Sequence, residues 1–224
     1  MAIITVGAEK GGVAKTKLAT NLAAKAATSG AEVLLLDTDI QGSSISWAAI
    51  RSGANISPEI TALSLPENPT TQLASLSNKY DLIVVDIGAQ NYKTMLQCAY
   101  LSDLVLVPCG ADQQEVESTL NVFDTLKRNG DKHKDGSGVI PAHVVLTRVS
   151  TAVNSKNIVE LRDLFSKFEI SVFDACLPSR TAWPQTGKTG KGVHELTGKD
   201  RSQKAVEEME ALFEEVKRRI VGGN

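Results

Sequence analysis

The sequence predicts an α/β fold, a three-layer, doubly wound, mostly parallel sheet flanked by helices. Short runs of apolar, β-branched residues recur along the 224-residue chain. They are apolar throughout and do not alternate with polar residues, which is typical of strands buried on both faces of a sheet. Helical stretches separate these runs, and such alternation favours parallel strands joined by right-handed crossovers.

The elements follow this alternation in order. The expected strands are 3–6, 33–36, 82–85, 104–107 and 144–146, with a sixth candidate at 170–173. The expected helices are 15–29, 70–77, 92–101, 114–128, 155–168 and a last one at 201–220. The last helix has one apolar face, acidic early turns and a basic final turn, which suits the helix dipole. Segment 129–138 has the composition of a surface loop, so we expect a single domain over 1–224.

Composition excludes several classes of protein. Apolar residues make up 42%, and the net charge of −2 argues against a protein that coats nucleic acid with its whole surface. The three cysteines are widely spaced and odd in number, which favours thiols in a reducing compartment over a disulfide framework or a zinc site. We find neither a secretory signal nor an apolar run of about 18 residues, so we expect a cytoplasmic protein.

A glycine-rich turn follows the first expected strand and ends on Lys15 and Thr16. In a phosphate-binding loop (P-loop), consecutive backbone N–H groups line a concavity at the N-terminus of the next helix and bind phosphate oxygens. A lysine then neutralises the β- and γ-phosphates and a hydroxyl ligates Mg²⁺, and Lys15 and Thr16 fit these two roles. The general pattern G-x-x-x-x-G-K-[ST] is broken at both glycines, by Glu9 and Ala14.

Three acidic residues lie where expected strands end, the edge at which open α/β sheets bind their ligands. Asp86 ends a buried strand and can hold Mg²⁺ through a water. Asp39 is placed to orient or polarise an attacking water, and we expect Asp37 to organise Mg²⁺ or the switch region. Helix capping or turn formation would explain one such aspartate, but three in this order favour a catalytic site.

The segment 10–16, Lys-Gly-Gly-Val-Ala-Lys-Thr, resembles the deviant Walker A sequence K-G-G-x-G-K-T of the ParA/MinD family of ATPases. The resemblance continues in order over most of the chain. Segment 34–42 is similar to the family's D-x-D-P-Q-G region, and 82–86 is similar to its Walker B strand. Segments 104–108, 144–148 and 192–195 also match, and the chain looks most like the short ParA proteins.

The resemblance implies a P-loop NTPase fold with ATP and Mg²⁺ as cofactors. It makes Lys10 a signature lysine that reaches the partner's nucleotide across a dimer interface, acting in catalysis with Lys15 and Asp39. The implied nucleotide-binding residues are Gly11, Gly12, Val13, Ala14, Lys15, Thr16, Lys17, Thr147, Arg148 and Pro178. The implied metal-binding residues are Thr16, Asp37 and Asp86.

The chain departs from the family pattern in four places, one of which is Ile40 in place of the usual proline. Ala14 adds a methyl group where glycine normally lets the backbone close on phosphate, yet we expect nucleotide binding to survive. Lys17 replaces the usual Thr or Ser, and it could either reach the phosphates or point to solvent. Residues 87–89 replace the T-P-P that often follows the Walker B aspartate, which leaves the second switch unpredicted. We expect slow hydrolysis.

The leading hypothesis from the resemblance is an ATP-dependent dimerising switch that positions plasmid or chromosomal DNA at the nucleoid. The ATP dimer would bind DNA without sequence preference through basic residues, and a small ParB-like DNA-binding protein would stimulate hydrolysis. Candidate basic clusters lie at 127–134, 180–204 and 217–219. The alternative is an adaptor ATPase acting on a protein cargo, a conjugation complex or a cell-division complex. A membrane switch that uses the last helix is a third and weaker hypothesis, because the apolar face of that helix lacks tryptophan. A metabolic enzyme such as a P-loop kinase is the least favoured.

Overall fold

The computed structural model describes residues 1–65, 69–89, 91–150 and 156–222. At its centre six strands form one sheet in the order β3-β2-β4-β1-β5-β6, with every pairing parallel. The strands are β1 (Ala2–Val6), β2 (Val33–Asp37), β3 (Thr61–Ser64), β4 (Leu82–Asp86), β5 (Leu104–Cys109) and β6 (Ala142–Leu146). The predicted doubly wound parallel sheet is therefore confirmed.

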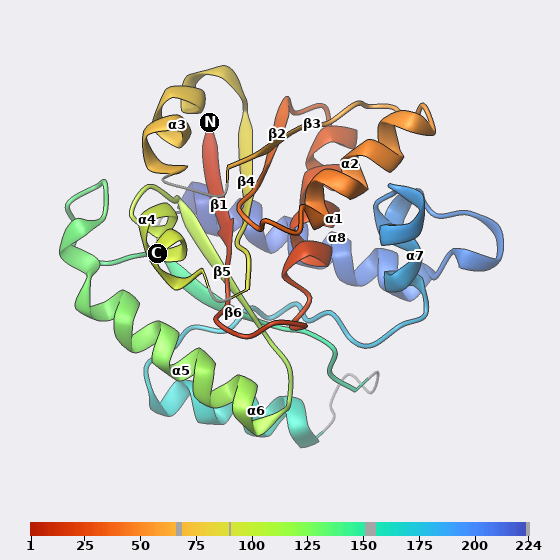
Figure 1. Cartoon of the computed structure of the whole chain (residues 1–224). Coiled ribbons are helices and arrows are strands. Elements are labelled where there is room, and N and C mark those ends of the chain that lie inside the picture. The colour runs from red at the N-terminus through yellow and green to blue at the C-terminus, as the bar shows by residue number, and fades with distance from the viewer. Residues whose placement is uncertain (66–68, 90, 151–155, 223–224) are drawn as a thin grey trace.

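Helices cover both faces of the sheet (Figure 1). The helices are α1 (Lys15–Thr28), α2 (Ser43–Gly53), α3 (Pro69–Leu76), α4 (Tyr92–Ala99), α5 (Gln113–Arg128), α6 (Lys156–Lys167), α7 (Ala182–Thr189) and α8 (Gln203–Gly222). Apolar side chains of α1, α2, α7 and α8 form one core layer with the sheet, and those of α3, α4 and α5 form the other. Helix α6 packs beside β6 and α5 at one edge.

The register of the strands brings acidic residues level with the loop after β1. Val6 pairs with Asp86, and Asp37 pairs with Asp86 on the other side, so β1, β4 and β2 end at the same height. In Figure 1 these ends point downward, toward the red loop between β1 and α1. Consecutive buried residues hold these strands in place, because each strand packs side chains on both faces.

The sixth predicted strand, 170–173, is wrong as a regular strand. Val172 of this segment pairs with Val144 of β6 in an isolated bridge, and a second isolated bridge joins Leu177 to Thr147, just after β6. The carboxylate of Glu215 on α8 accepts hydrogen bonds from the backbone N–H groups of Asp174 and Ala175, both at 3.0 Å. Because these donors bind a side chain, a continuous ladder does not form there.

Several boundaries and elements differ from the sequence-based expectation. The prediction did not include β3, α2 and α7. Strand β3 is a largely exposed edge strand and therefore shows no apolar run, while two of the three buried side chains of α2 are polar, and α7 has only eight residues. The predicted helix 155–168 is α6, and its first residue lies outside the described part of the chain. Segment 129–138 is a loop with the short 3₁₀ helix η2 (Gly130–Lys132).

Helix α8 directs its apolar side chains into the core. Met209, Phe213 and Val216 are buried against the sheet layer that also contains α1. Two of the three basic residues near its end form ion pairs within the helix, Lys217 with Glu214 and Arg219 with Glu215. Among the described residues, no helix combines the length and hydropathy that a membrane span needs.

Candidate functional site

The loop after β1 has the backbone shape of a phosphate cradle. Gly12 and Ala14 have positive φ angles of 77° and 73°, and α1 begins immediately after them. Gly11 and Gly12 are exposed, whereas the Val13 side chain is buried in the core. A loop with left-handed residues at these positions turns backbone N–H groups toward one point at a helix N-terminus, where an anion is stabilised.

Ala14 adopts the left-handed conformation that the missing glycine would favour. An alanine in this region costs roughly 1–2 kcal/mol relative to ordinary helical backbone. The loop is braced from the end of β6, since the buried Thr147 hydroxyl donates to the Val13 carbonyl at 3.1 Å. The cradle therefore forms in spite of the alanine, and Thr147 contributes by supporting its backbone.

Lys15 is a buried cation at the head of α1, with 8% of its surface exposed. Its ammonium donates to the Lys10 carbonyl at 2.8 Å, which bends the side chain back over the loop. Burial lowers the pKa of Lys15, and the nearby charges of Asp86 and Asp39 oppose that change. The ammonium is thus positioned beside the cradle and has acidic neighbours at the ends of β4 and β2.

Asp86 has a buried carboxylate oxygen near Lys15 and Thr16, at the start of α1. Its Oδ2 accepts from the Ser44 hydroxyl at 2.7 Å, while Oδ1 is buried and accepts no hydrogen bond from any described residue. Burial raises the pKa of Asp86 to about 6, and hydroxyls of Thr16 and Ser44 oppose the rise. An orphaned carboxylate oxygen next to a threonine hydroxyl fits the hard oxygen ligands that Mg²⁺ selects.

Asp37 fixes the start of α2. Its Oδ2 accepts from the backbone N–H groups of Ser44 and Ile45 at 2.8 and 3.2 Å, and its Oδ1 accepts from Asp39 N at 2.9 Å. The residue is fully buried. A carboxylate at a helix N-terminus is stabilised by the exposed N–H groups and the dipole. Of the two predicted roles, the geometry supports organisation of the switch segment.

Asp39 lies at the rim and is only half-buried. Its Oδ1 accepts from Gln41 N at 3.0 Å, and within the described ranges no further donor contacts the carboxylate. Gly88, at the end of β4, lets this segment come close, because a Cβ there would lie 3.0 Å from Asp39 Cα. A free carboxylate oxygen is therefore available to a water above the cradle.

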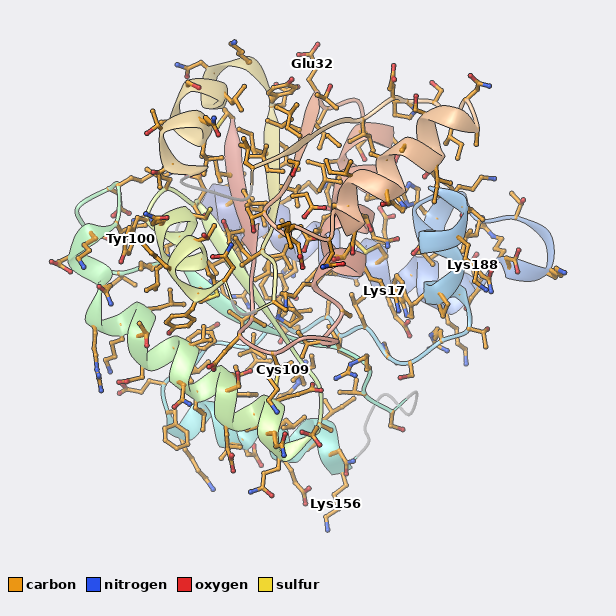
Figure 2. The ribbon with its side chains drawn as sticks, viewed as in Figure 1. Lys17, Glu32, Tyr100, Cys109, Lys156 and Lys188 are labelled. Carbon is orange, nitrogen blue, oxygen red and sulfur yellow. The ribbon has the colours of Figure 1, made fainter. Side chains whose placement is uncertain are left out.

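A cavity of about 420 Å³ opens between the N-terminus of α1 and the segments 147–148 and 177–184. Its lining includes Ala14, Lys17, Arg148, Pro178 and Trp183. The wall is largely apolar, and Lys17 is exposed there with no ion pair to a described residue. In Figure 2 Lys17 and Lys188 lie on the same side of the molecule, at the start of α1 and on α7. The structure thus brings Lys17, Arg148 and Pro178 together in the wall of one cavity.

The first turns of α5 contact the loop and the cavity rim. Gln114 Oε1 accepts from the Lys10 ammonium, and Glu9 accepts from the Ser118 hydroxyl at 3.0 Å. Glu115 accepts from Gly110 N at 2.8 Å and forms an ion pair with Arg148. Arg148 itself has a positive φ of 56°.

The sequence-based prediction missed Ser44, Gln114 and Glu115. Ser44 went unnoticed because α2 was not predicted, although Gly42 followed by two serines is a usual helix start. Gln114 and Glu115 had only the capping residue Asp112 as a sequence signal. Helix α5 is far from the loop in sequence, so only the sheet order reveals that contact.

Comparison with known proteins agrees with this geometry. The CobQ/CobB/MinD/ParA nucleotide binding domain matches residues 4–193. Protein ParA of Rhizobium radiobacter is 23% identical over 217 residues, covering 95% of this chain and 94% of ParA. Two similar solved structures are MinD of Pyrococcus horikoshii with Mg-ADP (18% identity, 99% and 97% of the two chains, TM-score 0.72) and an ATP complex of McdA from Cyanothece (15%, 97% and 96%, TM-score 0.71). The chain therefore belongs to the CobQ/CobB/MinD/ParA family of nucleotide-binding domains.

Proposed function

We propose that the protein is an ATP- and Mg²⁺-dependent switch that dimerises on ATP and positions DNA. The observation that carries the proposal is the buried Asp86 Oδ1, which has no partner among the described residues and lies beside the loop, Thr16 and Lys15. Two similar proteins of known structure hold ATP and Mg-ADP, respectively. The half-buried Asp39 carboxylate supports hydrolysis of that nucleotide.

Each group of the site has a role in this reaction. The loop N–H groups and the Lys15 ammonium would bind and orient the phosphates, and Thr16 and Asp86 would hold Mg²⁺. When bound, Mg²⁺ neutralises charge on the β- and γ-phosphates. Asp39 orients the water that attacks the γ-phosphorus and accepts its proton as ADP leaves. Asp37 keeps Asp39 and the start of α2 in register.

A second copy of the chain would complete the site. Ile40, next to Asp39, is 87% exposed at the rim, and a partner subunit would cover this apolar side chain. Lys10 would then contribute its charge to the partner's nucleotide, as the family resemblance implies. We expect saturating ATP with Mg²⁺ to convert monomer to dimer in analytical ultracentrifugation. An unchanged sedimentation coefficient with ATP bound would contradict the dimer.

Ion pairs within the chain favour one of the basic clusters as the proposed DNA-binding surface. In cluster 127–134, Lys127, Arg128 and Lys134 form ion pairs with acidic residues and His133 is buried. In cluster 180–204, Arg180 pairs with Glu208. The lysines of this second cluster have no acidic partner among the described residues; they are Lys188, Lys191, Lys199 and Lys204. We therefore place the DNA-binding surface on α7 and the segment that leads to α8.

A salt series tests the DNA proposal against the protein-cargo alternative. Because each neutralised phosphate releases a counterion, Lys188→Ala with Lys199→Ala should lower the slope of log affinity against log salt by about 2. Lys127→Ala with Lys134→Ala is the matched control and should leave the slope unchanged. Absence of any salt-dependent binding of duplex DNA by the ATP form would favour a protein cargo instead. Adding a ParB-like partner to the same samples tests stimulation of hydrolysis.

A further inference from the structure

Lys10 is held by its own chain on one side of the phosphate loop. Its ammonium donates to Gln114 Oε1 on the first turn of α5. In the sheet order β2-β4-β1-β5, the acidic residues follow β2 and β4, whereas α5 follows β5. The Lys10 ammonium therefore lies across β1 from Asp37, Asp39 and Asp86. Lys15 faces those acids, since the charges of Asp86 and Asp39 oppose the lowering of its pKa by burial.

The turn that holds Lys10 is itself fixed in place. Asp112 caps α5 by accepting from Gln114 N at 3.0 Å, which orders the backbone of the tethering residue. One turn later the Ser118 hydroxyl donates to Glu9 at 3.0 Å, so α5 also contacts the residue before Lys10. The position of Gln114 relative to the loop is thus set by the fold and does not depend on Lys10.

The chemistry of Gln114 makes this contact exchangeable. An amide oxygen is neutral, and a carboxylate or phosphate oxygen binds an ammonium more strongly because both partners are charged. The next residue shows the contrast, since Glu115 uses its full charge to hold Arg148 and also accepts from Gly110 N. At the first turn of α5, Arg148 is therefore bound by a charged carboxylate, whereas Lys10 is bound by a neutral amide.

We propose that Gln114 is a positioning residue that tethers Lys10 on the α5 side of the loop, and that nucleotide phosphate displaces the tether before Lys10 acts. The proposal rests on the proposed function for the second step alone. A carboxylate at position 114 should hold Lys10 more firmly and oppose its release. An alanine there should free Lys10 before any nucleotide binds.

Amine footprinting of the nucleotide-free protein tests the first step. With a limiting acylating reagent and mass spectrometry, Lys10 should be modified several-fold faster in Gln114→Ala and several-fold more slowly in Gln114→Glu. Gln113 lies on the same turn but bonds to Glu117, so Gln113→Ala and Gln113→Glu are matched controls. Equal Lys10 reactivity in wild type and Gln114→Ala would overturn the tether.

Titration with Mg-ATP tests the second step by sedimentation and by turnover. Gln114→Glu should raise the ATP concentration for half-maximal dimer by about tenfold, and Gln114→Ala should lower it, while Gln113→Glu matches wild type. A Gln114→Glu curve that overlays the wild type would overturn the displacement step. A wild-type protein that neither binds ATP nor dimerises would refute the proposed function instead, and footprinting would still report on the tether.

Discussion

Asp86→Asn should stabilise the nucleotide-free protein while it removes Mg²⁺-dependent nucleotide binding. Burial raises the pKa of this carboxyl from 3.8 to about 6. Because one pKa unit corresponds to about 1.36 kcal/mol, the ionised group opposes folding by about 3 kcal/mol above pH 6. The amide that replaces the carboxylate brings a buried N–H₂ donor, and its desolvation offsets part of this gain. We therefore expect the substitution to increase the free energy of unfolding by about 1–2 kcal/mol at pH 8.

The sign of the pH dependence follows from the direction of the shift. The folded state binds the proton more tightly than the unfolded state, so this group favours folding at low pH and the benefit disappears as pH rises through 6. Between pH 5 and pH 8 the group should cost the wild type about 1.4 kcal/mol. The variant should lack that dependence, because an amide does not titrate.

Urea unfolding in EDTA at pH 5 and pH 8 measures both quantities. Asp163→Asn, on the exposed side of α6, is the control and should change the free energy of unfolding by less than about 0.5 kcal/mol. A variant less stable than wild type at pH 8 would refute the reasoning, since it would mean that the Asp86 charge is stabilising in the folded protein. Isothermal titration with Mg-ATP then checks the loss of metal-dependent binding.

Three further predictions concern Ala14 in the loop, Lys17 at the cavity, and the ion pair between Arg51 of α2 and Glu195. Ala14→Gly should raise the free energy of unfolding by about 0.5–1 kcal/mol, since glycine relieves the positive φ; thermal denaturation checks this, and a loss of stability would contradict it. Lys17→Thr should weaken ADP binding by about tenfold at low salt and less at high salt, measured by fluorescent-nucleotide displacement. Glu195→Gln should cost about 3 kcal/mol in urea unfolding, because Arg51 is 1% exposed and its guanidinium bonds to both Glu195 oxygens at 2.7 and 2.9 Å. As a control, Asp174→Asn removes one partner of the ion pair between the exposed Asp174 and Arg162, and it should change the free energy of unfolding little.

The layered fold and the centre of the site could be predicted from the sequence. Continuous apolar runs are a local signal of buried parallel strands, and in such a sheet the strands must end at one edge. Loop residues and strand-end acids such as Lys15 and Asp86 therefore meet wherever the strands are correctly identified. The prediction failed where that signal is absent, at the exposed strand β3, and where a remote side chain intervenes, as Glu215 does beside β6.

The sequence by itself determined the phosphate loop and the acidic strand ends, because both are encoded by short local patterns. Only the tertiary structure decided what each of them contacts. Asp37 binds N–H groups at the start of α2, Asp86 keeps one oxygen without a hydrogen bond from the described residues, and Lys10 bonds to Gln114, more than a hundred residues away. Such contacts depend on the order of strands in the sheet, and local propensity carries no information about that order.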